Sequence, residues 1–214
     1  MGDFSKNFSE ISELLQKGKS KDIGAAVEKA LKDGAGAADI LQKGLLAGMD
    51  VIGTKFKDGD VFIPEVLLAA KAMKQGAAVL KPALTKAGVK AIGKAVCCTV
   101  KGDQHDIGKN LVKMMIEGRG FEVTDLGADV EPDAIVTCVK QTGAHLVCLS
   151  ALLTTTMMAQ KDTIEALKAA GVRGQVKVLV GGSPITQDFC NDIGADGYAG
   201  DAASAADLAV SFFK

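Results

Sequence analysis

Apolar residues recur three or four positions apart through residues 1–84, the spacing that places side chains on one face of a helix. The pattern predicts four amphipathic helices that pack as a bundle. Gly18 and Gly34 mark helix ends, Ser20 is a candidate N-cap of the second helix, and the fourth helix begins at Pro64 and runs to about Lys81. The stripes of the first three helices comprise Phe8, Ile11, Leu14 and Leu15, then Ile23, Val27 and Leu31, then Leu41, Leu45, Met49, Ile52 and Phe56.

The pattern changes at Gly93, from which short β-branched runs alternate with helical segments. Such alternation is typical of a parallel sheet with helices on both faces and favours an α/β fold with the flavodoxin-like strand order 2-1-3-4-5. Strands are predicted at 94–100, 121–126, 145–150, 176–180 and 197–199, and helices at 107–118, 132–142, 156–170, 184–192 and 201–213. We therefore expect a helical domain over residues 1–88 and an α/β domain over residues 89–214, with a hinge within residues 82–92.

Three unusual loops follow the first, third and fourth predicted strands, at residues 102–108, 150–156 and 181–183. The carboxyl ends of parallel strands share one edge of the sheet, and that edge is where open α/β sheets bind ligands. The loops are therefore expected to converge on one binding crevice.

His105 is the candidate metal ligand in the first of these loops. A neutral imidazole ligates a metal through one nitrogen while its other N–H donates to a carboxylate, which Asp103 could supply. A solvated histidine is the more common explanation of an isolated Asp-x-His-x-x-Gly segment, and only the other two loops favour a site. One histidine cannot hold a zinc or iron ion by itself, so a macrocycle would have to supply the remaining ligands. The other histidine, His145, opens the third strand at the opposite edge and is expected to be structural.

Small and hydroxyl-bearing residues in the three loops leave two explanations open. Gly102, Gly108, Gly181 and Gly182 would admit a bulky ligand, or would serve turn chemistry alone. The hydroxyls of residues 150 and 154–156 would bind a polar nucleotide tail, or would cap the following helix.

Composition narrows the class of function. A net charge of -1, from 25 basic and 26 acidic residues, gives no field that would attract nucleic acid or an acidic membrane. The five cysteines include no Cys-x-x-Cys pair, so neither a disulfide framework nor a zinc clamp is predicted. With no apolar signal region and no apolar run long enough to span a membrane, a cytoplasmic protein is expected.

The three loops together carry a recognisable fingerprint. It consists of Asp103, His105 and Gly108, then Ser150 and Leu152, then Gly181 and Gly182. In this order and spacing the chain resembles the corrinoid-binding proteins of methyltransferase systems, a family that includes the cobalamin modules of methionine synthase. The resemblance covers nearly the whole chain, because the family also carries an N-terminal helical cap and residues 61–73 look like the helix that covers the upper face of the corrin ring.

The resemblance implies a cobalamin-type corrinoid whose benzimidazole tail is displaced from cobalt and buried beside the sheet. His105 would be the lower cobalt ligand, Asp103 would accept its other N–H, and Thr156 would extend this relay where methionine synthase has serine. Ser150 and Thr154 would contact the nucleotide, and Gly181, Gly182 and Tyr198 would line its slot. The other implied contacts are Gly102, Gln104, Asp106, Ile107, Gly108 and Leu152 in the loops, and Phe62, Val66, Ala69, Ala72 and Met73 on the cap helix, a stripe that a plain bundle core would explain equally well.

The resemblance further implies a carrier that is not catalytic alone. It would take a methyl group onto cobalt from a substrate-specific methyltransferase and pass it to a second methyltransferase, with tetrahydrofolate or coenzyme M as acceptor and a separate reductive activator. Two alternatives remain: the corrinoid subunit of an adenosylcobalamin-dependent mutase, which the helical cap disfavours, and a B12-sensing module, which would need a separate output protein.

Overall fold

The computed structural model describes residues 3–214. The chain divides into two compact units, a helical unit over residues 1–90 and an α/β unit over residues 91–214. Each unit has its own core.

The helical unit contains the four predicted helical segments. They are α1 (Ser5–Gln16), α2 (Ile23–Lys32), a continuous rod formed by α3 (Ala37–Asp39), the π-helical η1 (Ile40–Leu46) and α4 (Ala47–Asp58), and α5 (Ile63–Lys86). Their apolar stripes form the core, in which Ile11, Leu15, Ile23, Val27 and Leu45 are fully buried. This arrangement confirms the helical N-terminal part of the predicted fold.

Two local predictions in this unit are wrong. Asp22, whose side chain makes no capping hydrogen bond, is the N-cap of α2, so Ser20 lies in the preceding turn. Helix α5 runs to Lys86 because it accommodates Pro82 in its interior, although proline removes one hydrogen bond of the helix. The predicted hinge at 82–92 is therefore helical over its first five residues, and the chain leaves α5 at Ala87 and Gly88.

The α/β unit is a five-stranded, all-parallel sheet in the order β2-β1-β3-β4-β5, as predicted. Its strands are β1 (Lys94–Thr99), β2 (Glu122–Asp125), β3 (Leu146–Ser150), β4 (Lys177–Gly181) and β5 (Gly197–Tyr198). The helices are α6 (Ile107–Gly118), α7 (Pro132–Thr142), α8 (Met158–Ala169), the short 3-10 helix η2 (Arg173–Gln175), α9 (Gln187–Ile193) and α10 (Ala202–Ser211).

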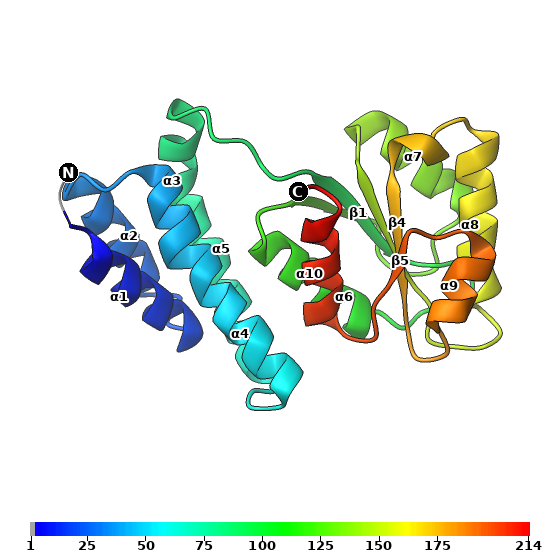
Figure 1. The fold of residues 1–214 in the computed structure, drawn as a ribbon, viewed down its shortest axis with the longest axis horizontal. Coiled ribbons are helices and arrows are strands. Elements are labelled where there is room, and N and C mark those ends of the chain that lie inside the picture. Colours follow the sequence, from blue (N-terminus) through cyan, green and yellow to red (C-terminus); the bar gives the residue numbers. More distant parts are fainter. Residues whose placement is uncertain (1–2) are drawn as a thin grey trace. The chain divides into compact units, whose positions relative to one another are not determined.

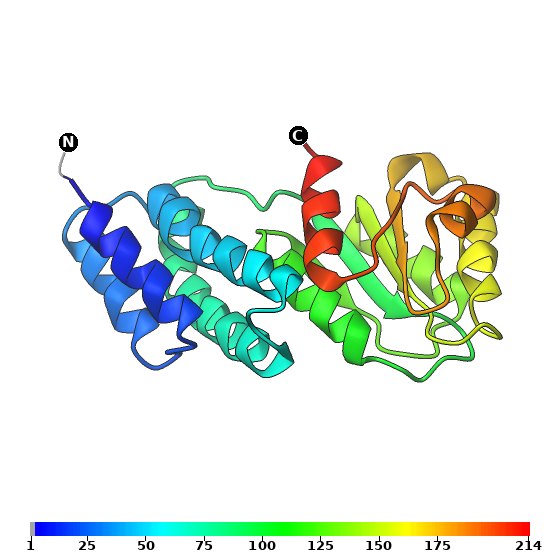
Figure 2. The same ribbon diagram turned by 60° about the horizontal axis from the view of Figure 1, so that its bottom comes forward.

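Helices cover both faces of this sheet. Figures 1 and 2 show α6 and α10 together on one face and α7, α8 and α9 on the other. The second face holds an apolar cluster that includes Val96, Val147 and Val178 from the strands and Ile135 and Ile164 from the helices. A sheet buried on both faces is rigid, and it fixes the loops that leave its edge.

His145 lies at the amino end of β3, as predicted. Its backbone N–H donates to the Lys94 carbonyl at 2.8 Å, and its own carbonyl accepts from the Lys177 N–H at 2.8 Å. The ring meets Phe213 edge to face, with centroids 6.4 Å apart. His145 therefore links the amino ends of β1, β3 and β4. It lies at the opposite end of the strands from the loops at the carboxyl edge.

Candidate functional site

Three strands end in one row at the carboxyl edge of the sheet. Thr99 of β1 pairs with Ser150 of β3, and Ser150 pairs with Gly181 of β4. The loops at 102–108, 150–156 and 181–183 therefore leave the sheet from neighbouring positions, and the predicted convergence is confirmed.

Asp103 is the centre of the hydrogen bonding at this edge. Its side chain is fully buried. One carboxylate oxygen, Oδ1, lies 2.7 Å from the His105 ring nitrogen Nδ1 and accepts from the His105 backbone N–H at 3.0 Å. The other oxygen, Oδ2, accepts from the Leu152 backbone N–H and from the Thr156 hydroxyl, both at 2.7 Å. The carboxylate thus joins the first loop to the second.

These hydrogen bonds determine the charge of Asp103. Burial by itself raises the pKa of the carboxyl group. The opposing hydrogen bonds, from the Thr156 hydroxyl, from the backbone of His105 and Leu152 and from the His105 ring, hold the pKa well below its ordinary value. Asp103 is therefore an anion throughout the neutral range and presents negative charge to the imidazole.

His105 is oriented by this carboxylate and by the backbone of its own loop. Its Nδ1 faces Asp103, and its carbonyl accepts from the buried Thr99 hydroxyl at 2.9 Å. The side chain is 51% exposed, and no hydrogen bond to Nε2 occurs within residues 3–214. An imidazole that is anchored through Nδ1 with Nε2 unengaged is prepared to ligate a metal through Nε2.

A metal at this position would need ligands from elsewhere. Within the described part of the chain, no group of three or more His, Cys, Asp or Glu side chains is placed to hold a metal ion. This donor set does not suit a metal held by protein ligands alone, and it fits a metal whose equatorial ligands belong to a macrocycle.

The glycines of the loops have different structural reasons. A Cβ at Gly182, which has φ of 127°, would lie 1.8 Å from the Ala151 carbonyl oxygen, so the protein's own backbone requires glycine there. A Cβ at Gly181 would lie 3.1 Å from the Ala199 carbonyl oxygen, and Gly102 has φ of 80°. At Gly108, in contrast, a Cβ would meet nothing within 4 Å. The open space at Gly108, at the start of α6, is the kind of space that a bulky ligand would fill.

The hydroxyl residues also separate into groups. Thr156 is buried and precedes α8, which begins at Met158 and not at residue 156 as predicted. Its hydroxyl donates to the Asp103 carboxylate and does not cap the helix. Thr154 and Thr155 are exposed, whereas Ser150 and Tyr198 are half-buried at the ends of β3 and β5. Gln104 and Asp106 are exposed beside His105.

Exposed apolar side chains occur in the loop of the imidazole and in the loop that bonds Asp103. Ile107 is 72% exposed, Leu152 42% and Leu153 40%. Ile107 follows His105 by two residues, and Leu152 donates its N–H to Asp103. Apolar side chains that point to solvent beside a polar ligating group suit a large, mostly apolar ring.

On the helical unit, the exposure of the predicted cap residues differs from expectation. Phe62 is 67% exposed, but Val66, Ala69 and Ala72 are fully buried and Met73 is 7% exposed. These four belong to the core of the helical unit, because the stripe of α5 packs on the other helices. The exposed large apolar residues at the start of α5 are its N-cap Phe62 and Ile63, Leu67 and Leu68. Of the predicted cap set, only Phe62 has an exposed side chain.

Sequence reasoning missed three residues that build the site. Thr99 holds the His105 carbonyl, and Asp129 bonds Gly102 and Gln104. Gln160 is fully buried; its Nε2 donates to the carbonyls of Leu149 and Gly181, both at 3.1 Å, and its Oε1 has no hydrogen-bond partner among the described residues. The hydrogen bonds of Asp129 and Gln160 join segments that are distant in sequence, and that of Thr99 joins a strand to the loop after it, so no local sequence pattern reveals them.

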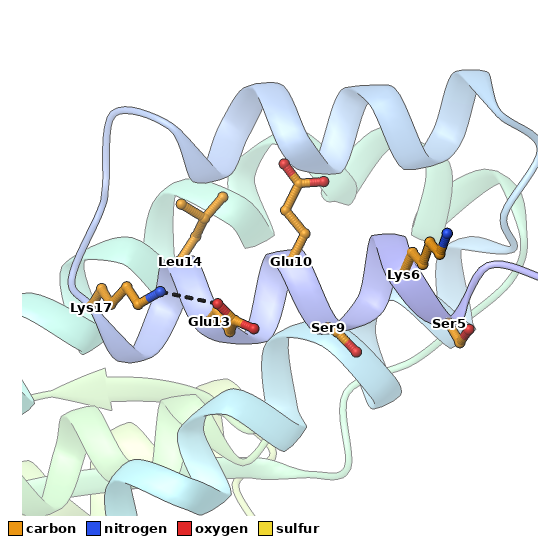
Figure 3. Close-up of a pocket in the computed structure, with 7 residues that line it drawn as sticks. All are labelled: Ser5, Lys6, Ser9, Glu10, Glu13, Leu14 and Lys17. Atoms are coloured by element: carbon orange, nitrogen blue, oxygen red, sulfur yellow. Dashed lines mark hydrogen bonds and ion pairs between the residues drawn. The ribbon is translucent and has the colours of Figure 1, made fainter.

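A hollow also occurs along α1, shown in Figure 3. It is lined by Ser5, Lys6, Ser9, Glu10, Glu13, Leu14 and Lys17. Its charged groups include the exposed ion pair of Lys17 with Glu13, 3.0 Å apart. None of the predicted site residues lies in it.

Comparison with known proteins identifies the family. A family described as B12 binding domain matches residues 93–208, and a second with the same description matches residues 8–81. The chain belongs to the B12-binding family.

Two relatives of this B12-binding chain show how far the similarity extends. A dimethylamine corrinoid protein of Methanosarcina acetivorans is 46% identical over 199 residues, which cover 92% of this chain and 91% of the relative. A corrinoid protein of Desulfitobacterium hafniense is 41% identical over 203 residues, which cover 94% of each chain.

A solved structure agrees over both units of this B12-binding chain. The methanol:cobalamin methyltransferase complex of Methanosarcina barkeri matches with a TM-score of 0.86 and 30% identity, over 97% of this chain and 80% of that chain. Within residues 3–214, no helix is both long and apolar enough to cross a membrane.

Proposed function

We propose that this protein carries a methyl group on the cobalt of a bound corrinoid, with His105 as the lower ligand of the metal. One observation carries the proposal: His105 is anchored to the buried Asp103 carboxylate through Nδ1 and leaves Nε2 unengaged at the ligand-binding edge of the sheet. The family, and relatives that are corrinoid proteins of methylamine systems, support it.

The chain's own residues would hold and orient the cofactor. Asp103 keeps the imidazole in one tautomer, with the proton on Nδ1, and Thr156 and the Leu152 N–H keep Asp103 itself in place. The negative charge of Asp103 makes His105 a stronger donor toward the metal. When bound, the corrinoid supplies a cobalt centre that accepts a methyl group and later releases it.

The remaining loop residues would bind the rest of the corrinoid. Gly102, Gln104, Asp106, Ile107, Gly108 and Leu152 would line the side of the ring that faces the sheet. Ser150 and Thr154 would contact the nucleotide tail, with Gly181, Gly182 and Tyr198 along its slot. The open space at Gly108 and the half-buried position of Ser150 support this division.

A carrier needs other proteins to load and unload it. A substrate-specific methyltransferase would supply the methyl group, and the dimethylamine and methanol systems of the similar proteins indicate small methylated amines or alcohols as the donor class. A second methyltransferase would remove the methyl group, and a reductive activator would restore oxidised cobalt. The cysteines within residues 3–214 are all free and buried, which suits the reducing cytoplasm that we propose as its location.

Reconstitution with hydroxocobalamin tests the proposal. After removal of free cofactor, we expect the protein to retain the coloured corrinoid at about one per chain, and to become methylated when a methylamine- or methanol-specific methyltransferase and its substrate are added. Protein that stays colourless would refute corrinoid binding. A native cofactor extracted with a 5'-deoxyadenosyl ligand would instead favour the mutase alternative.

The exposed apolar residues of α5 would shield the methyl group from water, in place of the buried residues first predicted. We expect the double substitution Phe62→Ser and Leu67→Ser to speed the loss of methyl from the reconstituted protein to solvent, because both side chains are exposed. Val51→Ser is the matched control, since Val51 is an exposed apolar residue on α4 of the same unit. Equal demethylation rates in the double variant and the control would remove the proposed shielding role.

A further inference from the structure

Asp129 has an unusual backbone conformation. With φ of 56°, it is the one residue other than glycine with positive φ in the described chain, residues 3–214. An L side chain rarely adopts this left-handed region, although aspartate tolerates it better than most residues. Glycine would occupy the position without strain, so the presence of an aspartate there needs a reason in its side chain.

The side chain of Asp129 bonds the loop that carries His105. Its Oδ1 accepts from the Gly102 backbone N–H at 2.7 Å, and its Oδ2 accepts from the Gln104 side-chain Nε2 at 3.1 Å. Its own backbone N–H donates to the Asp103 carbonyl at 2.9 Å. Asp129 thus makes three hydrogen bonds to the three consecutive residues that precede His105.

The segment around Asp129 is itself fixed to the sheet. Between β2 and α7, the Leu126 N–H donates to the Cys97 carbonyl at 3.0 Å, and the Val130 N–H donates to the Thr99 carbonyl at 3.1 Å. The Thr99 N–H donates back to the Gly127 carbonyl at 2.9 Å. Asp129 therefore projects from a segment that continues the parallel sheet next to β1.

The loop of His105 is held from two sides as a result. On one side, Thr156 and the Leu152 N–H bond the Asp103 carboxylate. On the other side, Asp129 bonds the backbone of Gly102 and Asp103. The first side sets the direction of the imidazole within the loop, and the second sets the position of the loop on the sheet.

We propose that Asp129 is a positioning residue for the lower ligand: its carboxylate fixes residues 102–104 so that His105 stays bonded to the cobalt of the corrinoid. The inference rests on the proposed function, because it assumes that His105 is a ligand. Without the Asp129 carboxylate, the loop gains freedom, and part of the bound corrinoid loses its axial nitrogen.

Three substitutions separate the carboxylate from the backbone conformation. Asp129→Gly removes the side chain and relieves the strain, and Asp129→Ala removes the side chain but keeps a Cβ at positive φ. Asp129→Asn retains one acceptor for the Gly102 N–H and an amide that can pair with the Gln104 amide, and asparagine tolerates the conformation. Asp133→Ala is the matched control, because Asp133 is an exposed carboxylate in the first turn of α7 without a hydrogen bond to the loop.

The first readout is the electron paramagnetic resonance of the Co(II) form of each reconstituted full-length variant. In Asp129→Gly and Asp129→Ala, we expect the ratio of nitrogen-coordinated to uncoordinated cobalt to fall by roughly tenfold, the effect typical of losing an outer partner of a metal ligand. Asp129→Asn and Asp133→Ala should keep the wild-type ratio. A wild-type ratio in Asp129→Gly would overturn the proposal.

The second readout is amide hydrogen exchange of the cofactor-free chain, followed in peptides that cover residues 101–106. Exchange there should be faster by about tenfold in Asp129→Gly than in the wild type, because the Gly102 N–H has lost its acceptor. Unchanged exchange would refute the proposal that Asp129 fixes residues 102–104. If wild-type Co(II) protein lacked any nitrogen splitting, the proposed ligation by His105 would fail instead, and exchange would still decide whether Asp129 holds the loop.

Discussion

Gly182→Ala is expected to destabilise the α/β unit and abolish corrinoid retention. A Cβ at this position would lie 1.8 Å from the Ala151 carbonyl oxygen, a separation that atoms cannot adopt, and the backbone has φ of 127°, which alanine strongly disfavours. Relief requires the loops after β3 and β4 to separate. We expect a loss of about 3–5 kcal/mol in the free energy of unfolding, the range of severe single substitutions.

Gly171→Ala distinguishes the clash from the effect of positive φ. Gly171 also has positive φ, 71°, but a Cβ there would meet nothing within 4 Å. Its substitution should cost about 1 kcal/mol and leave corrinoid binding intact. Urea unfolding of both variants measures the difference. Equal stability of the two would show that the loop at Gly182 adjusts freely, and the tight approach to Ala151 would then have no energetic importance.

The sequence was most informative where local signals set the structure. Helices α6 and α7 have the predicted bounds. In α7 the local signals are clear, because Pro132 suits a first helical position and Gly143, with φ of 65°, ends the helix in a left-handed cap. The sheet order followed from the alternation of strands and helices. The resemblance also implied a hydrogen-bond relay through Asp103 and Thr156, and the structure contains its two hydrogen bonds, between Asp103 and the His105 ring and from the Thr156 hydroxyl to Asp103.

Other features depend on packing that no local pattern encodes. On α5, apolar residues occupy more than one face, so periodicity could not tell that Ala69 and Ala72 are buried while Leu67 and Leu68 are exposed. The fourth helix was expected to run to about Lys81, but α5 continues through Pro82 to Lys86, because propensity is only a weak constraint on where a helix ends. Asp129 precedes α7 in a segment that reads as an ordinary turn, and only its position beside Gly102 in space reveals its role.

His105→Ala is expected to remove the axial nitrogen signal from the electron paramagnetic resonance of the Co(II) form. His105 provides the anchored imidazole whose Nε2 makes no hydrogen bond within residues 3–214. Loss of the ligand itself should weaken corrinoid retention at least as much as the 10- to 100-fold typical of losing an outer partner. The fold should survive, because the side chain is 51% exposed and Asp103 keeps three other donors.

His145→Ala is the decisive control, because the sequence contains two histidines only. His145 packs against Phe213 at the amino end of β3 and makes its hydrogen bonds through the backbone. Its substitution should leave the nitrogen splitting unchanged. A splitting that persists in His105→Ala would assign the axial nitrogen to the corrinoid's own base, and the imidazole held by Asp103 would then serve the loop and not the metal.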